Sequence, residues 1–172
     1  MKIGIISDTH DKVLGVDQAM RIFSEQAVGL IVHCGDWAKP ETAQYFAAMA
    51  AAARIPVKGV LGNNDREIDA FLDISHKHSG FALQEGVLKF TVDGRIVSAY
   101  HGHHKPTLKN LLTEPIDLLC LGHSHKPRYD VLDDRIIINP GSTAFAIPRS
   151  RTWHASVAVY DTKKHEAEFI YF

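Results

Sequence analysis

The sequence predicts an α/β fold in which two β-sheets pack face to face and helices cover their outer faces. Two observations lead to this prediction. Between residues 2 and 61, short apolar runs alternate with segments of helical periodicity. From residue 81 onward, the pattern changes to pairs of short strands separated by turn residues. A βαβαβ unit followed by strand pairs is typical of two packed sheets.

The first part of the chain predicts three strands and two helices. The three strands are short, apolar and rich in β-branched residues, and they span 2–7, 30–34 and 57–61. The first helix is predicted from apolar residues at helical spacing, which are Val16, Ala19, Met20 and Phe23. The second helix begins at Pro40 and continues through the alanine-rich segment 41–53.

The second part of the chain predicts a second, more antiparallel sheet. The strongest turn signal is Asp93-Gly94, which is typical of a two-residue hairpin. The predicted strand pairs are 87–92 with 95–100, 129–132 with 135–138, and 155–161 with 166–171. A short helix is predicted at 106–112, and the apolar run 117–121 is predicted to be a buried strand.

Length and composition indicate a single domain, 1–172, of an ordinary globular protein. The net charge is −1 and there is no basic run, so no extended nucleic-acid surface is evident. The sequence contains neither a membrane-spanning segment nor a signal peptide. Cys34 and Cys120 lie in apolar runs and are expected to be reduced core residues. These features predict a cytoplasmic protein without a membrane partner.

Residues that can bind metal ions follow five of the predicted strands. They are Asp8, His10, Asp36, Asn63, His101, His123 and His125. In open α/β sheets the ligand crevice lies beyond the carboxyl ends of the strands, so we expect these side chains to converge. Carboxylate, imidazole and amide ligands without thiolate suit Mn, Fe, Ni, Co or Zn. Seven ligands suit two divalent ions that share one carboxylate, which would hold the two ions roughly 3.5–4 Å apart.

Five ordered motifs resemble the signature of the calcineurin-like metallophosphoesterases, and in particular their small single-domain phosphodiesterase branch. The motifs are Asp8-x-His10, Gly35-Asp36, Gly62-Asn63, His101-Gly102 and Gly122-His123-Ser124-His125. The resemblance implies an α/β/β/α sandwich of four layers, with two packed mixed sheets flanked by helices. It also implies phosphoester hydrolysis by a hydroxide that bridges two metal ions, of which manganese is the first choice.

The resemblance also implies a role for each metal-binding residue. It assigns Asp8, His10 and His125 to the first ion, and it assigns Asn63, His101 and His123 to the second. Asp36 would bridge both ions.

One position departs from the pattern of many family members. They have histidine directly after the metal-binding asparagine, whereas this chain has Asn64. An amide donates a hydrogen bond but cannot deliver a proton at neutral pH. General acid catalysis typically contributes about 10²–10⁴-fold, so substrates with poor leaving groups should react slowly. Asn64 and His103 are the predicted catalytic residues, with His103 as the nearest substitute proton donor.

Several of these residues also have plain structural interpretations. Asp8 and His10 could belong to a turn, and Asp36 could cap a helix. His33 is predicted to be a hydrogen-bonded core residue. The remaining histidines are predicted to be solvated, namely His76 and His78 in a polar loop, His104, His154 and His165.

Two further groups could contact a substrate. The amides of Gly141 or Ser142, in the turn 139–142, could face it, as the amides of a glycine turn can. Arg149 and Arg151 could meet a phosphate, although an exposed arginine is usually only solvated.

The sequence therefore predicts a metal-dependent phosphodiesterase whose partner is a small phosphodiester. Two alternatives share the fold: a phosphomonoesterase, and a binding scaffold similar to the retromer scaffold subunit of the same superfamily. A scaffold is expected to have lost metal ligands, and this chain retains all seven. A plain nucleotide-binding domain would instead have a glycine-rich loop after the first strand. The sequence leaves open whether the chain forms a homo-oligomer.

Overall fold

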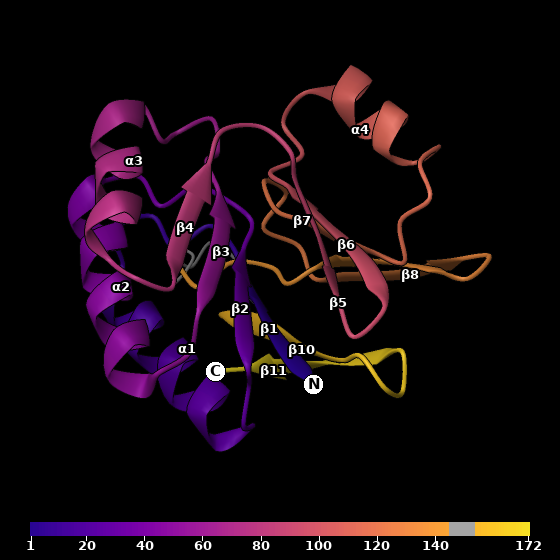
Figure 1. Cartoon of the computed structure of the whole chain (residues 1–172), viewed down its shortest axis with the longest axis horizontal. Helices are drawn as coiled ribbons and strands as arrows, with labels where there is room; N and C mark the ends of the chain where they lie inside the picture. The colour runs from indigo at the N-terminus through magenta and orange to yellow at the C-terminus, as the bar shows by residue number, and fades with distance from the viewer. Residues whose placement is uncertain (145–153) are drawn as a thin grey trace.

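The computed structural model describes residues 1–144 and 154–172, and its two sheets pack against each other with helices on the outside (Figure 1). This arrangement confirms the predicted four-layer sandwich of two mixed sheets. Arg149 and Arg151 lie outside the described residues.

The first sheet has six strands in the order β11-β10-β1-β2-β3-β4. Their bounds are β1 Lys2–Ile6, β2 Leu30–His33, β3 Val57–Val60, β4 Phe81–Gln84, β10 Ser156–Asp161 and β11 Glu166–Tyr171. The strands β1 to β4 are parallel, and β10 pairs with β1 in the antiparallel direction. Strand β1 therefore lies inside the sheet, between β2 and the C-terminal strand β10.

The second sheet has five strands in the order β5-β6-β7-β9-β8. Their bounds are β5 Leu88–Val92, β6 Arg95–Tyr100, β7 Leu118–Leu121, β8 Arg128–Leu132 and β9 Arg135–Asn139. The hairpins β5–β6 and β8–β9 are antiparallel, as predicted, but the central pairs β6–β7 and β7–β9 are parallel. The predicted last hairpin forms, but it extends the first sheet rather than the second.

Three helices cover the first sheet and one covers the second (Figure 1). They are α1 Val13–Glu25, α2 Pro40–Ala53, α3 Ile68–Lys77 and α4 Lys105–Leu111. Between the sheets lies an apolar layer that includes Ile5, Val32, Val97 and Leu118. Among the described residues, no helix is long and apolar enough to cross a bilayer.

Helix α3 and strand β4 were not predicted. In α3, Ile68, Phe71 and Ile74 recur at helical spacing, and Phe71 and Ile74 are buried. The prediction of a polar loop around His76 was wrong, because His76 and Lys77 form the last turn of α3. Both elements are short, and their positions depend on packing against α2 and β3, which local sequence does not encode.

His33, at the end of β2, is a fully buried core residue, as predicted. Its ring stacks on the Trp37 indole with a centroid distance of 3.4 Å. Its Nδ1 atom accepts a hydrogen bond from the Gly35 amide at 3.1 Å. Burial lowers the pKa of His33 to about 3, so the ring is neutral at physiological pH.

We expect His33 to make the folded protein sensitive to acid. The unfolded chain binds a proton at His33 below its ordinary pKa of 6.5, whereas the folded chain does so only near 3. The stability contributed by neutral His33 is therefore present above pH 6.5 and is lost as the pH falls toward 3. Replacing His33 by Gln should remove up to about 1.4 kcal/mol per pH unit of this dependence, measured by denaturant unfolding.

His76→Gln is the matched control, because His76 is exposed. Its free energy of unfolding should follow the parent at every pH. Parallel pH profiles for the parent and His33→Gln would contradict the assignment of a neutral buried ring.

Candidate metal centre

Five of the predicted metal ligands have left-handed backbone conformations. The φ angles are 55° at Asp8, 41° at His10, 59° at Asp36, 68° at His123 and 56° at His125. Asp and His tolerate this region better than most residues, but it is still strained. Such strain often accompanies functional sites, where the backbone must aim side chains in a direction that regular structure does not allow. Here it turns the loops after β1, β2 and β7 toward one another.

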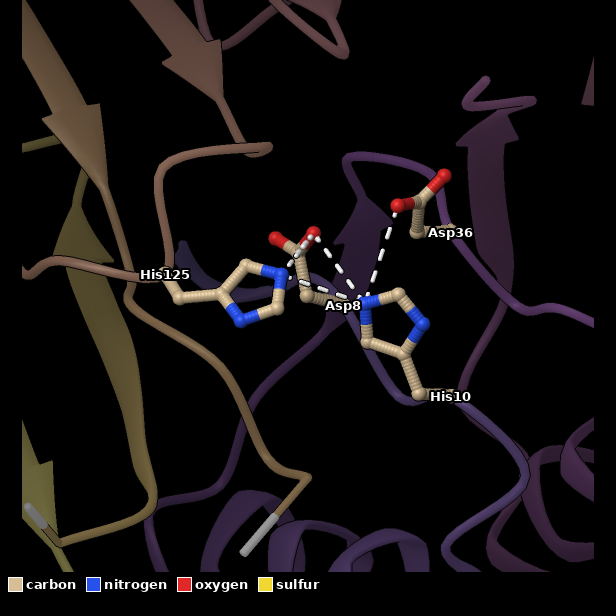
Figure 2. A group of neighbouring side chains, drawn as sticks. All are labelled: Asp8, His10, Asp36 and His125. Carbon is tan, nitrogen blue, oxygen red and sulfur yellow. Dashed lines mark hydrogen bonds and ion pairs between the residues drawn. The ribbon is translucent and has the colours of Figure 1, made fainter. Parts of the chain in front are cut away.

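Asp8, His10, Asp36 and His125 form one compact cluster (Figure 2). One nitrogen or oxygen atom from each lies within 4.8 Å of the others. His125 Nε2 lies 3.1 Å from Asp8 Oδ1, and His10 Nε2 lies 3.6 Å from Asp36 Oδ2. Asp8 and Asp36 are buried, whereas the two imidazoles reach the surface. The two carboxylates therefore lie at the buried side of the cluster, and the two imidazoles lie at the side open to solvent.

A second cluster shares Asp36 with the first. His101 Nε2 lies 3.3 Å from Asp36 Oδ1 and 3.1 Å from Asn63 Oδ1. The His123 ring lies next to that of His101, with a centroid distance of 5.1 Å. One oxygen of Asp36 thus faces His10, and the other faces His101. His10 thus lies on one side of Asp36, with Asp8 and His125 beside it, and His101 and Asn63 lie on the other side, with the His123 ring next to His101.

The hydrogen bonding of His101 leaves Nε2 free to bind a cation. Its Nδ1 atom lies 2.8 Å from the carbonyl oxygen of Cys34, which can only accept a hydrogen bond. The proton of a neutral ring therefore sits on Nδ1, and the lone pair of Nε2 points at two oxygen atoms. His101 Nε2 and the facing oxygen atoms of Asp36 and Asn63 are thus three possible ligand atoms for a metal ion.

Charges in both clusters favour cation binding. Burial acts to raise the pKa of Asp8, but the neighbouring imidazoles of His10 and His125 and a hydrogen bond from the Ser7 hydroxyl to Oδ2 outweigh it and hold the pKa well below its usual range. Burial likewise acts to raise the pKa of Asp36, but His101 and Asn64 lower it to about 2. Both carboxylates are ionised at neutral pH. Among residues 1–144 and 154–172, Asp8 Oδ1 has no well-aligned hydrogen-bond donor. This buried charge fits a divalent cation.

Asn64 lies against the shared carboxylate. Its side-chain amide donates to Asp36 Oδ2 at 2.6 Å, and its backbone amide donates to Asp36 Oδ1 at 2.9 Å. His103 is exposed, with its ring centroid 5.6 Å from that of His101 and 6.4 Å from that of His123. Asn64 therefore supports Asp36, and His103 lies at the rim of the second cluster.

Sequence analysis missed the residue that fixes the Asp36 loop. The buried Asp65 carboxylate accepts hydrogen bonds from the backbone amides of Asp36 at 3.0 Å, Gly62 at 2.7 Å and Ala38 at 2.7 Å. Burial raises its pKa, and the three amide donors oppose that effect only in part. Asp65 joins the loop after β2 to the loop after β3. Its place in the run 62–65, directly after a strand, was the available signal.

Backbone packing also restricts the loop that carries His123 and His125. A side chain at Gly122 would place its Cβ atom 2.1 Å from Ser7 Oγ and 3.1 Å from Asp8 Oδ2. The carbonyl of Gly122 accepts a hydrogen bond from Asn139 Nδ2 at 2.6 Å. Glycine is therefore required here for the close approach of the loop to Asp8.

Asp36, Gly141 and His165 make contacts that differ from those expected from the sequence. Asp36 is not a helix cap, because α2 begins after Lys39. The amide of Gly141 donates to Asn139 Oδ1 at 3.0 Å, so it is engaged within its own turn. His165 is not merely solvated, because its ring contacts Tyr160 Oη at 2.6 Å and the Asp134 carbonyl at 2.8 Å.

Known phosphoesterases are similar to this protein over nearly the whole chain. The family model for the calcineurin-like phosphoesterase superfamily domain matches residues 1–165. A protein named a phosphodiesterase from Methanocaldococcus jannaschii is 29% identical over 171 residues, covering 96% of each chain. A probable metallophosphoesterase from Methanothermobacter thermautotrophicus is 32% identical over 178 residues, covering 99% of this chain and 92% of the relative. A solved structure of an archaeal phosphodiesterase matches with a TM-score of 0.87 and 26% identity over 100% of both chains.

We expect Asp36→Asn to lower the occupancy of both metal positions. The substitution removes the charge that faces both clusters while keeping the size of the side chain. Elemental analysis after loading and desalting should show about two divalent ions per parent chain and well under one per variant chain.

His76→Ala, at an exposed position of α3, is the control and should retain the metal content of the parent. One tightly held ion in the parent, or the loss of only one ion in Asp36→Asn, would contradict a shared carboxylate.

Proposed function

Because the chain belongs to the calcineurin-like phosphoesterase superfamily, we propose that it is a two-metal phosphodiesterase that hydrolyses small phosphodiesters. The observation that carries this proposal is the position of Asp36, whose two oxygen atoms face two different sets of ligands. A carboxylate in this position can hold two cations at the short separation that phosphoryl chemistry uses.

The proposed ligand sets follow the two clusters. Asp8, His10 and His125 hold the first ion together with Asp36. Asn63, His101 and His123 hold the second, again with Asp36. This set of oxygen and imidazole nitrogen atoms suits manganese first, and nickel, iron, cobalt or zinc as alternatives.

The protein's own residues hold the proposed metal ligands in fixed orientations. When bound, the ion pair supplies Lewis acidity and a water molecule of lowered pKa for attack on phosphorus. The Cys34 carbonyl holds the His101 ring in the tautomer that leaves Nε2 free. Asp65 and Asn64 fix Asp36 from its backbone and from its carboxylate. Preorganisation of this kind avoids rearrangement during the reaction.

Two features support a diesterase over the alternatives. A phosphate monoester carries an additional negative charge, and the position after Asn63 offers a neutral amide rather than a cationic histidine. A relative of this chain is named a phosphodiesterase. A pure binding scaffold would not need buried, ionised carboxylates that face three imidazoles. The metal centre therefore favours catalysis over scaffolding.

We also propose that one domain, 1–172, acts in the cytoplasm. Cys34 and Cys120 are free and buried, which suits a reducing compartment. The proposed partner is a small phosphodiester, with no requirement for a membrane or an extended nucleic acid.

A direct test is an activity screen of purified protein with aryl and cyclic-nucleotide diesters, with each metal added in turn. We expect hydrolysis that a chelator abolishes and that one of the named metals restores. Binding of two ions without hydrolysis of any ester would favour the scaffold, and faster hydrolysis of monoesters than of diesters would favour a phosphomonoesterase.

Asn64 predicts a steep dependence of rate on the leaving group. Without a proton donor at this position, aryl diesters should react readily and alkyl diesters slowly. Asn64→His should raise the rate on alkyl diesters relative to the rate on aryl diesters by on the order of tenfold or more, which flattens the dependence. Steady-state kinetics over a series of leaving groups measures both slopes.

His103→Ala separates two interpretations of the histidine at the rim. A loss confined to alkyl diesters would identify His103 as the proton donor. An equal loss on all substrates would assign it to phosphate or metal positioning. Equal rates for aryl and alkyl diesters in the parent would contradict our account of Asn64.

A further inference from the structure

A cleft of about 440 Å³ lies beside the second cluster. We propose that it binds one organic arm of the substrate, and that this arm is flat, uncharged and the size of a ring. The inference rests on the proposed phosphodiesterase function and adds a substrate class to it. Pockets that bind small molecules typically have volumes of about 300–1,000 Å³, so the cleft has room for such a group.

The cleft connects directly to the proposed metal centre. One wall is the loop after β3, where Gly62 immediately precedes the proposed ligand Asn63. The opposite wall follows β6 and includes His103, two residues after His101. The third wall is the connection from β4 to β5, which arches over the top of the molecule between α3 and α4 (Figure 1). A diester whose phosphate binds at the second cluster would have this cleft next to one of its substituents.

The lining of the cleft favours a flat ring. Leu61 and Tyr100 are buried, and together with the half-buried Ile68 and Val87 they make part of the lining apolar. The Tyr100 and His103 rings lie 5.6 Å apart between centroids, tilted by 36°. The exposed His103 imidazole offers a face that can stack on a planar group, and the buried Tyr100 ring lies behind it. The hydroxyl of Tyr100 is already engaged with the backbone amide of His104 at 3.0 Å, which fixes this wall.

The charges of the lining disfavour an anionic arm. The described residues that line the cleft include the carboxyl groups of Glu85 and Asp65, and they include no lysine or arginine. A second phosphate or a carboxylate would therefore meet negative charge without a cationic partner. A neutral arm with hydrogen-bond donors would instead find Glu85 as an acceptor. The cleft thus selects diesters that carry an aryl-like or nucleobase-like arm.

A larger cleft does not compete for this role. It has a volume of about 530 Å³ and lies near Pro115, Asp117 and Asp134. These residues are at the N-terminal ends of β7 and β9, whereas the proposed metal ligands follow the C-terminal ends of their strands. The described residues that line it are not adjacent in sequence to any proposed ligand, whereas Gly62 in the cleft beside the second cluster directly precedes Asn63.

Binding of phosphinates tests the inference without relying on turnover. Dimethylphosphinate and methyl(phenyl)phosphinate carry the charge of a phosphodiester, but their carbon–phosphorus bonds resist hydrolysis. Isothermal titration calorimetry on the metal-loaded protein should show methyl(phenyl)phosphinate binding about tenfold more tightly, because its ring enters the cleft. Thr107→Trp fills the cleft from α4 and should bring the two affinities together.

Lys109→Trp introduces the same side chain at an exposed position of α4 outside the cleft and should retain the affinity ratio of the parent. Val87→Trp fills the cleft from the connection between β4 and β5, and it replaces Thr107→Trp if that variant does not fold. Methyl(4-carboxyphenyl)phosphinate should bind several-fold more weakly than the phenyl probe to the parent, and Glu85→Gln should restore most of that loss.

The outcomes distinguish this inference from the proposed function. If the parent hydrolyses diesters but binds the phenyl and methyl probes with equal affinity, the proposed role of the cleft is wrong. The proposed phosphodiesterase function would still stand. A ratio that Thr107→Trp and Val87→Trp do not change would also overturn the proposed role of the cleft. No binding of either phosphinate and no hydrolysis of any diester would overturn both.

Discussion

The structure depends on keeping one buried carboxylate, Asp36, ionised and fixed. Its two oxygen atoms face two histidine clusters from different strands, so a small rotation would disturb both. Asp65 holds its backbone, and Asn64 holds its carboxylate from the side. Such a charge is costly to bury unless it is paired, and the surrounding imidazoles are its partners. The loops after β2 and β3 are built around this requirement.

The central features of the fold and the site were predictable because they depend on local patterns. Buried parallel strands appear as short apolar runs, and the hairpin β5–β6 is marked by Asp93-Gly94. Side chains such as Asp8 and Asp36 could be placed at one edge because parallel strands bring their carboxyl ends together. The prediction that the seven candidate metal ligands lie at one edge follows from this rule together with the ordered motifs.

Other features were not predictable because they depend on distant partners. Nothing near β10 indicates that it pairs with β1 rather than with a strand of the second sheet. The contact of Asn64 with Asp36 joins two loops 28 residues apart, and only the fold defines it. Position 122 is a further example, because glycine is required there only by the close approach of Ser7 and Asp8. Sequence identifies the residue types, and tertiary packing decides which of them touch.

The interior position of β1 has a consequence for folding during synthesis. The ribosome releases β1 to β4 first, and these strands can form a parallel unit with α1 to α3. The other edge of β1 stays unpaired until β10 has been made, more than 150 residues after β1 begins. An open strand edge can pair with other chains, so the nascent protein is exposed to aggregation over that interval. The C-terminal hairpin closes this edge, and therefore it also protects the strand that places Asp8 in the candidate metal centre.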